Sequence, residues 1–417
     1  MEHPTVTFHP LKNALLTNQE QTLDVLVRVT APRQTSLRVE RLPLNLALVI
    51  DRSGSMSGAK IETAKRVALA ALDRLKAQDR FSVVTFDNEV EVVVPSTKGD
   101  DTALARAQIK AIEARGQTDL HSGWLEGATQ VATHLQSGHL NRVLLLSDGE
   151  ANVGLTDRGE IAGQARGLAQ RGVSTTTFGM DDDYDELLLE ALATGGDGNY
   201  HYVEDVRQLE GIFDAELLDL SQTYGRGVSL GIEPYKQEGV TVQDVLNDLE
   251  PIRTGRYRLP NLRHGQPVEV LFRLRVPEGA TRTTGTMLGV TRVRVAWDDP
   301  MTGQRYRFRA QLDLPVLSAQ EYEAVVPDQE VEIASARLQI ARSKDEAARA
   351  LRRGDVEEAT AAYGRAVRTH SVAPASPLMD REFGELNVLG DALRAGDNAR
   401  ARKLSSSQVY NRRRSRE

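Results

Sequence analysis

Three oxygen-bearing side chains follow an apolar run near residue 50, and their types and spacing favour binding of a hard cation. Residues 46–50 are continuously apolar, and Asp51, Ser53 and Ser55 come next at alternate positions. A short apolar run bounded by turn residues is typical of a buried strand in a parallel sheet. Such sheets bind ligands just beyond the carboxyl ends of their strands. One carboxylate and two hydroxyls at that edge suit Mg²⁺ or a similar ion.

Two later segments add oxygen ligands of the same kind. Gly116 leads a loop that contains Thr118 and precedes an amphipathic stretch, and a second apolar strand, residues 143–147, ends at Asp148. The candidate metal ligands of the whole chain are therefore Asp51, Ser53, Ser55, Thr118 and Asp148. An isolated Asp-x-Ser-x-Ser stretch could also be a helix N-terminus, where the hydroxyls accept hydrogen bonds from backbone N–H groups.

The order of these motifs resembles the von Willebrand factor A domain with its metal-ion-dependent adhesion site. The resemblance covers about residues 44–220, and the stretch from Phe178 to Tyr200 is similar to bacterial members of the family. It implies an α/β fold of the Rossmann-like kind, with a doubly wound, mostly parallel sheet.

The resemblance also implies how a metal would be held. Ser53 and Ser55 would bind it directly, Thr118 directly or through water, and Asp51 and Asp148 through coordinated waters. The expected ion is Mg²⁺, with Mn²⁺ and Ca²⁺ as alternatives. Neutral donors leave the charge of a dication poorly compensated, so a Glu or Asp of a partner protein could complete the coordination.

The function implied is metal-dependent protein binding without catalysis, and two alternatives stay open. One is a Mg²⁺-dependent phosphohydrolase of the haloacid-dehalogenase kind, which needs an Asp where this chain has Ser53. No Gly-x-Ser-x-Gly elbow surrounds Asp51, and no phosphate loop ending in Gly-Lys-Ser/Thr is present. The other is a scaffold that binds partners through its C-terminal helices, with an idle metal site.

The composition of the chain excludes several other classes of functional site. The chain has 417 residues, a net charge of −7 and no cysteine, which excludes disulfides, zinc–thiolate sites and cysteine nucleophiles. The acidic balance gives no sign of nucleic-acid binding. No leader and no apolar run of membrane-spanning length is visible, so we expect a cytoplasmic protein. The oligomeric state is left open.

We expect four segments along the chain. Residues 1–43 would supply the first strands of a β-sandwich, 44–221 the α/β domain, 222–318 the rest of the sandwich, and 319–417 helical hairpins with a basic tail. Within 44–221, strands are predicted at 44–50, 81–86, 143–147 and 173–178, with an edge strand at 89–94. Helices are predicted at 59–77, 104–113, 123–135, 161–171, 184–193 and 206–220. Alternation of this kind indicates a mostly parallel sheet covered by helices.

Outside the α/β domain, clean alternation predicts antiparallel strands around residues 23–29, 268–276, 292–297 and 305–314, and a further strand at 36–42. The N-terminal strands are too few to bury a core alone. We therefore expect them to pair with 225–317 and to form one sandwich into which the α/β domain is inserted. After Pro374 and Pro377, which break the chain, a weaker helical hairpin is predicted at 383–404, following helices at 332–353 and 356–369.

Three charged features allow more than one interpretation. Asp181, Asp182 and Asp183 with Asp185 could hold a second cation or cap a helix. Arg52 could pair with an acid of a partner. The arginines of the last two strands could form a docking surface for an acidic partner or a solvated sheet face. These arginines are Arg292, Arg294, Arg305, Arg307 and Arg309.

Overall fold

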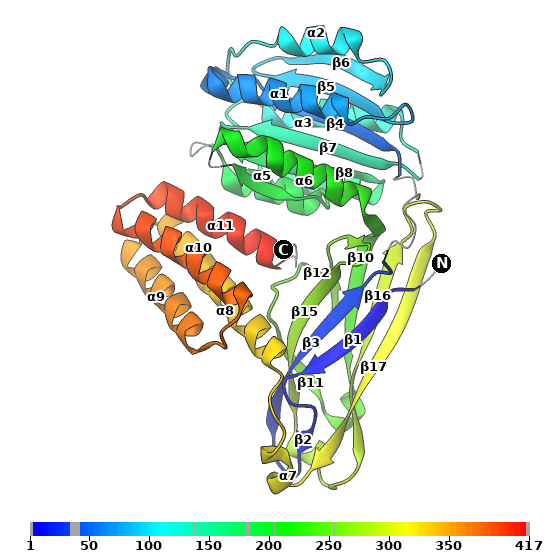
Figure 1. Ribbon diagram of the computed structural model, residues 1–417, viewed down its shortest axis with the longest axis vertical. Helices are drawn as coiled ribbons and strands as arrows, with labels where there is room; N and C mark the ends of the chain where they lie inside the picture. The colour runs from blue at the N-terminus through cyan, green and yellow to red at the C-terminus, as the bar shows by residue number, and fades with distance from the viewer. Residues whose placement is uncertain are drawn as a thin grey trace. The chain divides into compact units, whose positions relative to one another are not determined.

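The computed structural model describes residues 3–33, 42–136, 138–149, 151–180, 184–203, 205–253 and 255–413. They fall into two compact units, drawn in Figure 1. One unit comprises Met1–Leu37, Tyr224–Asp299 and Gln304–Glu417, and the other Arg38–Thr223 with Pro300–Gly303. The second unit is thus an insertion in the first, as the predicted fold class requires. The strand predicted at 36–42 lies almost wholly outside the described residues.

The inserted unit contains a six-stranded sheet in the order β6-β5-β4-β7-β8-β9. Its strands are β4 (Leu44–Asp51), β5 (Arg80–Phe86), β6 (Val90–Lys98), β7 (Leu140–Ser147), β8 (Val173–Met180) and β9 (Tyr200–Val203). All neighbours are parallel except β6, which runs antiparallel to β5 at the edge. The mostly parallel sheet and its edge strand are confirmed, whereas β9 was not predicted.

Helices cover both faces of this sheet, which makes it doubly wound. They are α1 (Ala59–Asp73), α2 (Ala103–Lys110), α3 (Leu120–Thr133), α4 (Arg158–Gln170), α5 (Glu186–Gly195) and α6 (Leu209–Ser221). On β4, Leu46 and Leu48 belong to the core shared with α1, α2 and α6, whereas Val49 faces α3. A Cβ on Gly127 of α3 would lie 2.2 Å from Val49 Cγ2, so glycine lets α3 approach the sheet.

The other unit is a sandwich of two antiparallel sheets with a helical extension. The smaller sheet has the order β1-β3-β15-β11 and the larger β12-β13-β10-β16-β17-β2, in which β2 pairs with β17 in parallel. The strands of the smaller sheet are β1 (Thr5–Pro10), β3 (Gln21–Thr30), β11 (Thr241–Val245) and β15 (Pro267–Val276). Those of the larger sheet are β2 (Leu15–Leu16), β10 (Thr223–Pro234), β12 (Pro251–Arg253), β13 (Arg256–Arg258), β16 (Met287–Asp298) and β17 (Arg305–Leu317), with β14 (Leu262–Arg263) paired to β10.

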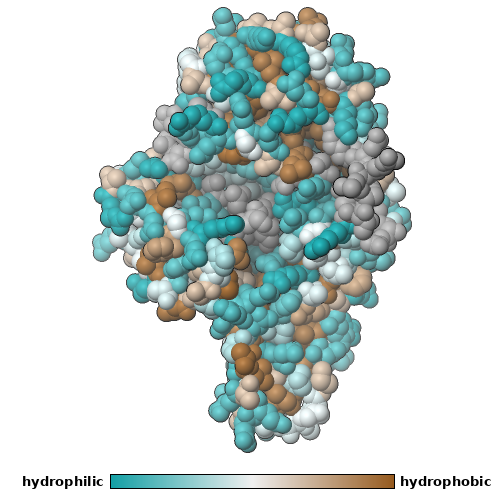
Figure 2. All heavy atoms as spheres, viewed as in Figure 1, coloured by the Kyte–Doolittle hydropathy of each residue, from teal (hydrophilic) through white to brown (hydrophobic). Residues whose placement is uncertain are grey.

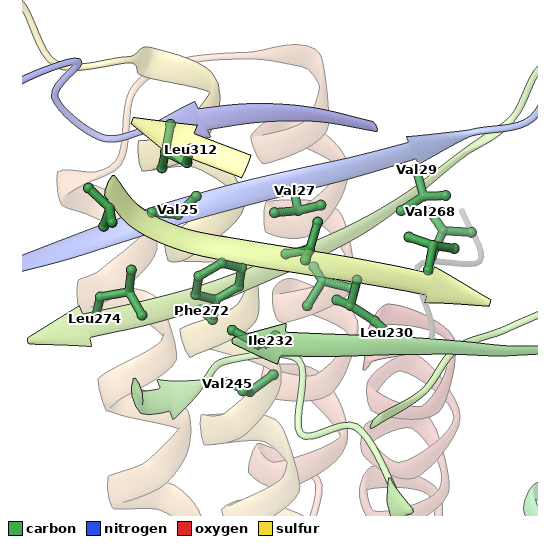
Figure 3. Close-up of a cluster of buried hydrophobic side chains, with 14 of the residues drawn as sticks. Val25, Val27, Val29, Leu230, Ile232, Val245, Val268, Phe272, Leu274 and Leu312 are labelled. Atoms are coloured by element: carbon green, nitrogen blue, oxygen red, sulfur yellow. The ribbon is translucent and has the colours of Figure 1, made fainter. Parts of the chain in front are cut away.

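The sandwich core joins segments that are far apart in the sequence. β3 pairs with β15 along its whole length, from Gln21 opposite Val276 to Thr30 opposite Pro267. Figure 3 shows Val25 and Val27 of β3 close to Phe272 of β15. The expected pairing of the N-terminal strands with the segment after residue 225 is therefore observed.

The helical extension belongs to the same unit as the sandwich. It consists of α7 (Ala319–Glu323), α8 (Gln329–Arg352), α9 (Val356–Val372), α10 (Pro377–Arg394) and α11 (Asn398–Arg413). Val331 and Leu338 of α8 pack on Leu26 and Leu271, on the outer face of the smaller sheet.

Two details of this extension differ from the sequence prediction. Pro377 begins α10 rather than breaking the chain, because proline suits the first turn of a helix and Ser376 caps Met379 N–H. α11 extends to Arg413, well past the predicted end at residue 404.

No helix in the described part of the chain is long and apolar enough to cross a membrane. On the face drawn in Figure 2, hydrophobic residues lie in small groups separated by hydrophilic ones.

A buried ion pair fixes α6 to the sheet of the inserted unit. The Glu216 carboxylate accepts hydrogen bonds from Arg142 Nη1 at 2.5 Å, Thr176 Oγ1 at 2.7 Å and Asn199 Nδ2 at 2.5 Å, with His201 Nε2 at 3.2 Å. Burial opposes ionisation, but the hydrogen bonds from His201 and Asn199 and the Arg142 charge hold the pKa of Glu216 well below its ordinary value. α6 is therefore held by charge as well as by apolar packing.

Replacing Glu216 with Gln leaves Arg142 buried without a counter-ion, so we expect the free energy of unfolding to fall by about 3–5 kcal/mol. Urea denaturation followed by circular dichroism measures the change. Glu210→Gln is the matched control: Glu210 lies on the same helix in an exposed pair with Arg66, and its loss should cost about 1 kcal/mol or less. Equal losses in both variants would contradict the assigned role of Glu216.

The same pair predicts a pH dependence. A carboxyl whose pKa is depressed by folding stabilises the protein above its unfolded pKa, near 4.5, and this contribution disappears as the pH falls toward the folded value. The difference in unfolding free energy between wild type and Glu216→Gln should be constant above about pH 6 and shrink below about pH 4.5. A difference that is independent of pH between 7 and 3.5 (about the accessible range) would contradict this prediction.

Candidate metal centre

Three loops meet at the carboxyl edge of the parallel sheet of the inserted unit. β4 ends at Asp51 and leads through a short 3₁₀ turn, Gly54–Met56, into α1. β7 lies beside β4 with Leu146 opposite Ile50, so Ser147 and Asp148 emerge next to Asp51. The third loop carries Thr118 just before α3.

Four of the five predicted ligands form one hydrogen-bonded group. Ser53 Oγ lies 3.0 Å from Ser55 Oγ, and Ser55 Oγ donates to Asp148 Oδ1 at 2.7 Å. Ser53 N–H donates to Asp51 Oδ1 at 2.8 Å, which folds the loop back onto its own strand. The alternating spacing of the motif thus brings Asp51, Ser53 and Ser55 together, and the pairing of β7 with β4 adds Asp148.

Thr118, the fifth predicted ligand, borders the same place on its other side. A Cβ built on Gly149 would lie 3.2 Å from Thr118 Oγ1, 3.6 Å from Ser55 Oγ and 3.8 Å from Asp51 Oδ2. Oxygens of three loops therefore surround one small space, which is open because residue 149 has no side chain. The Asn152 side chain accepts the Thr118 N–H at 3.1 Å and fixes the Thr118 loop.

The two carboxylates differ in their surroundings. Burial, with Asp148 nearby, raises the pKa of Asp51 to about 6, although hydrogen bonds from Ser147 and Ser53 oppose the shift. Asp148 is fully buried and its Oδ2 lies 2.7 Å from Lys60 Nζ. Positive charge at this place therefore stabilises the ionised carboxylates.

Three residues of the site were not among the predicted ligands: Ser147, Gly149 and Lys60. Ser147 Oγ donates to Asp51 Oδ2 at 2.6 Å, and Lys60 reaches Asp148 from the first turn of α1. Ser147 and Gly149 flank Asp148 in the sequence, which is a usable signal. Nothing in the sequence near Lys60 indicates that it reaches a loop after residue 147.

Arg52 has a different role from the one the sequence allowed. It is buried, and its guanidinium pairs within the chain with Asp87 at 3.1 Å and Glu91 at 2.6 Å. Arg115 also pairs with Asp87, at 2.9 Å. Arg52 is therefore a structural residue that joins β4 to β5 and β6, and it is not available to a partner.

Of the acidic run after β8, only Asp185 lies within the described residues. It caps α5 by accepting Leu188 N–H at 3.1 Å, as its alternative interpretation predicted. Asp181, Asp182 and Asp183 lie outside the described residues.

The donor set fits a hard divalent cation. Its oxygens are carboxylates and hydroxyls, the ligands that Mg²⁺, Mn²⁺ and Ca²⁺ prefer. The open space at Gly149 and the two clustered carboxylates are consistent with a bound positive ion. In the described residues no group of three or more His, Cys, Asp or Glu could hold a metal.

Comparison with known proteins agrees with this arrangement. The family model of the von Willebrand factor type A domain matches residues 45–215. An uncharacterized protein of Synechocystis is 26% identical over 376 residues, covering 82% of each chain. The uncharacterized protein YfbK of Escherichia coli is 31% identical over 220 residues, which cover 52% of this chain but only 37% of YfbK.

Two solved structures share the whole architecture. A von Willebrand factor type A protein from Catenulispora acidiphila matches with a TM-score of 0.71 at 17% identity, covering 98% of this chain and 96% of that one. The ArnB paralog VWA2 from Sulfolobus acidocaldarius matches with a TM-score of 0.63 at 19% identity, covering 99% of each chain. At these identities the likeness shows the fold alone. Residues 45–215 are therefore a von Willebrand factor type A domain, inserted in a β-sandwich that also bears C-terminal helices.

Proposed function

We propose that the inserted domain is a metal-dependent protein-binding module. Ser53, Ser55 and Thr118 would hold a divalent cation, with Asp51 and Asp148 orienting its waters and balancing its charge. The observation that carries the proposal is the convergence of these oxygens, from three loops, around the space that Gly149 leaves open.

The expected cation is Mg²⁺, because it keeps several waters and is usually bound by few protein ligands. Mn²⁺ and Ca²⁺ are the alternatives that a titration would separate. When bound, the cation supplies an open coordination position that favours an anionic oxygen from outside the chain.

The partner we propose is a protein that offers a Glu or Asp side chain to this position. Lys60 supports this choice, because its ammonium group lies at the rim of the site, 19% exposed and paired with Asp148. An incoming carboxylate would meet positive charge from the cation and from this side chain. Arg52 plays no part in this contact, since its charge is already neutralised by Asp87 and Glu91.

We further propose that the module has no catalytic activity of its own. The hydroxyls of Ser53 and Ser55 bond to each other and to a carboxylate, and among the described residues no histidine hydrogen-bonds to either. The second acid required by the phosphohydrolase alternative is replaced by Ser53.

Gly149→Ala should weaken metal binding about tenfold, because its methyl group would occupy the space beside Ser55 Oγ and push Thr118 Oγ1, 3.2 Å away, out of position. Isothermal titration with Mg²⁺ and Mn²⁺ measures the affinity. Gly163→Ala, on the surface of α4 where a Cβ meets open space, is the control and should leave the affinity unchanged. If Gly149→Ala binds the ions as wild type does, the cation site lies elsewhere.

Capture of partner proteins from native lysate tests the function itself. Wild type should retain a partner in Mg²⁺ and lose it in EDTA, and Asp51→Ala should fail to retain it in either buffer. Asp100→Ala removes an exposed carboxylate from the same domain and should behave as wild type.

The same partner in all samples would move the binding to the sandwich or the helices. Hydrolysis of a simple phosphate ester that disappears in Asp51→Ala would instead support the phosphohydrolase alternative.

A further inference from the structure

A cluster of arginines lies on the outer face of the larger sheet of the sandwich. Alternate residues of β16, such as Val293 and Val295, point into the core, and so do Tyr306 and Phe308 of β17. The arginines between them therefore point outward. The cluster, named the arginine face here, consists of Arg253, Arg256, Arg258, Arg292, Arg294, Arg305, Arg307 and Arg309.

Strand register brings half of these arginines into one line across the sheet. Arg309 lies opposite Arg294, which lies opposite Gly231, and Gly231 lies opposite Arg256, which pairs with Arg253. With about 4.8 Å between strands, this line crosses about 19 Å of sheet.

Gly231 leaves a gap in the middle of the line. A groove of about 1270 Å³ borders it, lined in part by Gly231, Arg253, Arg256 and Arg294 and also by the acidic residues Glu233, Asp244 and Asp248. Because residue 231 has no side chain, a narrow chain can approach the guanidinium groups of Arg294 and Arg256 on the two sides of β10.

Only part of this positive charge is neutralised within the chain. Glu233 pairs with Arg294 at 2.5 Å, Asp298 with Arg305 at 2.8 Å and Glu250 with Arg258 at 3.3 Å. In the residues that the structure describes, no ion pair reaches the remaining arginines of the line and of β17, namely Arg253, Arg256, Arg307 and Arg309.

The concentration of positive charge on this face opposes folding. Like charges directly opposite each other, as Arg294 and Arg309 are, destabilise a sheet. Partial burial and the charges of Arg253, Arg294, Arg305 and Arg307 lower the pKa of Arg256. A solvated sheet face needs no such concentration of one sign of charge, whereas an anionic ligand would relieve it.

The chemistry of the face favours carboxylates on an extended chain. Guanidinium groups pair with carboxylate or phosphate through two parallel hydrogen bonds. Surfaces for single-stranded nucleic acid add exposed aromatic side chains for base stacking. Here Tyr306 and Phe308 pack against the core, and the ring of Tyr235 is covered by Arg292 at 4.9 Å.

The spacing along β17 also matches an extended peptide. Arg305, Arg307 and Arg309 recur at every second residue, a repeat of about 6.8 Å, which is the distance between alternate side chains of an extended segment. We propose that the arginine face binds an extended, acidic polypeptide segment of a partner protein, whose alternate Glu or Asp side chains pair with these arginines. This site is independent of the metal centre and of the proposed function.

Fluorescence anisotropy with a labelled peptide of alternating Glu and Thr, sixteen residues (about 50 Å when extended), tests the proposal. Wild type should bind it at low ionic strength, and binding should weaken as salt is added. Arg307→Glu/Arg309→Glu should lose at least tenfold in affinity. The control Arg282→Glu/Arg368→Glu makes the same change in net charge at exposed arginines of the same unit and should bind within about twofold of wild type.

Three results would overturn the proposal: no binding by wild type at low salt, an equal loss in the control variant, or tighter binding of an oligothymidylate of equal charge. If Arg307→Glu/Arg309→Glu has a lower unfolding temperature than wild type, Arg307→Gln/Arg309→Gln replaces it. This second variant should show a smaller loss of peptide affinity. Asp51→Ala and EDTA should leave peptide binding unchanged, so failure here is distinct from failure of the metal-dependent function.

Discussion

The parallel pairing of β4 with β7 is the constraint on which the candidate metal centre depends. With Leu146 opposite Ile50, the two strands end together and bring Asp51 and Asp148 to the same edge. Two buried carboxylates in one place repel each other, and burial raises the pKa of Asp51 accordingly. The surrounding oxygens and the ammonium group of Lys60 offset this cost, and a bound cation would offset it further.

Buried charge elsewhere in the chain is neutralised by ion pairs between elements. Glu216 holds α6 to the sheet through Arg142, and Lys344 joins α8 to α10 through Glu382 at 2.6 Å and Glu385 at 2.8 Å. Arg52 links β4 to its neighbours through Asp87 and Glu91. These pairs fix elements relative to each other, whereas Asp51 and Asp148 lie beside an open space. Charged side chains that are paired with each other stabilise the fold, whereas charged side chains beside an open space can take part in binding.

The proposed ligands of the metal centre and of the arginine face are both carboxylates, but the two sites would bind them by different means. At the metal centre, a cation would present one open coordination position to one carboxylate. The arginine face would present a row of guanidinium groups to several carboxylates. The chain as a whole is acidic, with a net charge of −7, so both are local exceptions to its general charge. An acidic partner would therefore be recognised at particular places rather than by long-range attraction.

The sequence alone determined what local pattern controls. Continuous apolar runs identified β4 and β7, alternation identified β3, β15, β16 and β17, and motif order identified the family and the candidate ligands. These predictions succeed because a strand buried on both faces is continuously apolar, whereas a strand buried on one face alternates apolar and polar residues. The helical ends at Pro377 and Arg413 were misjudged, because helix boundaries depend on capping and packing rather than on period.

Only the tertiary structure decided which distant residues meet. Lys60 reaches Asp148 across 88 residues, Arg52 pairs with Asp87 and Glu91 instead of a partner, and Arg294 lies opposite Arg309 because two strands pair in one register. None of these contacts can be predicted from the neighbouring sequence. The sequence around a charged residue does not indicate whether its counter-ion lies in the same chain or in a partner. The charges that are already neutralised, and those that are left for a ligand, are known only once the strands are in register.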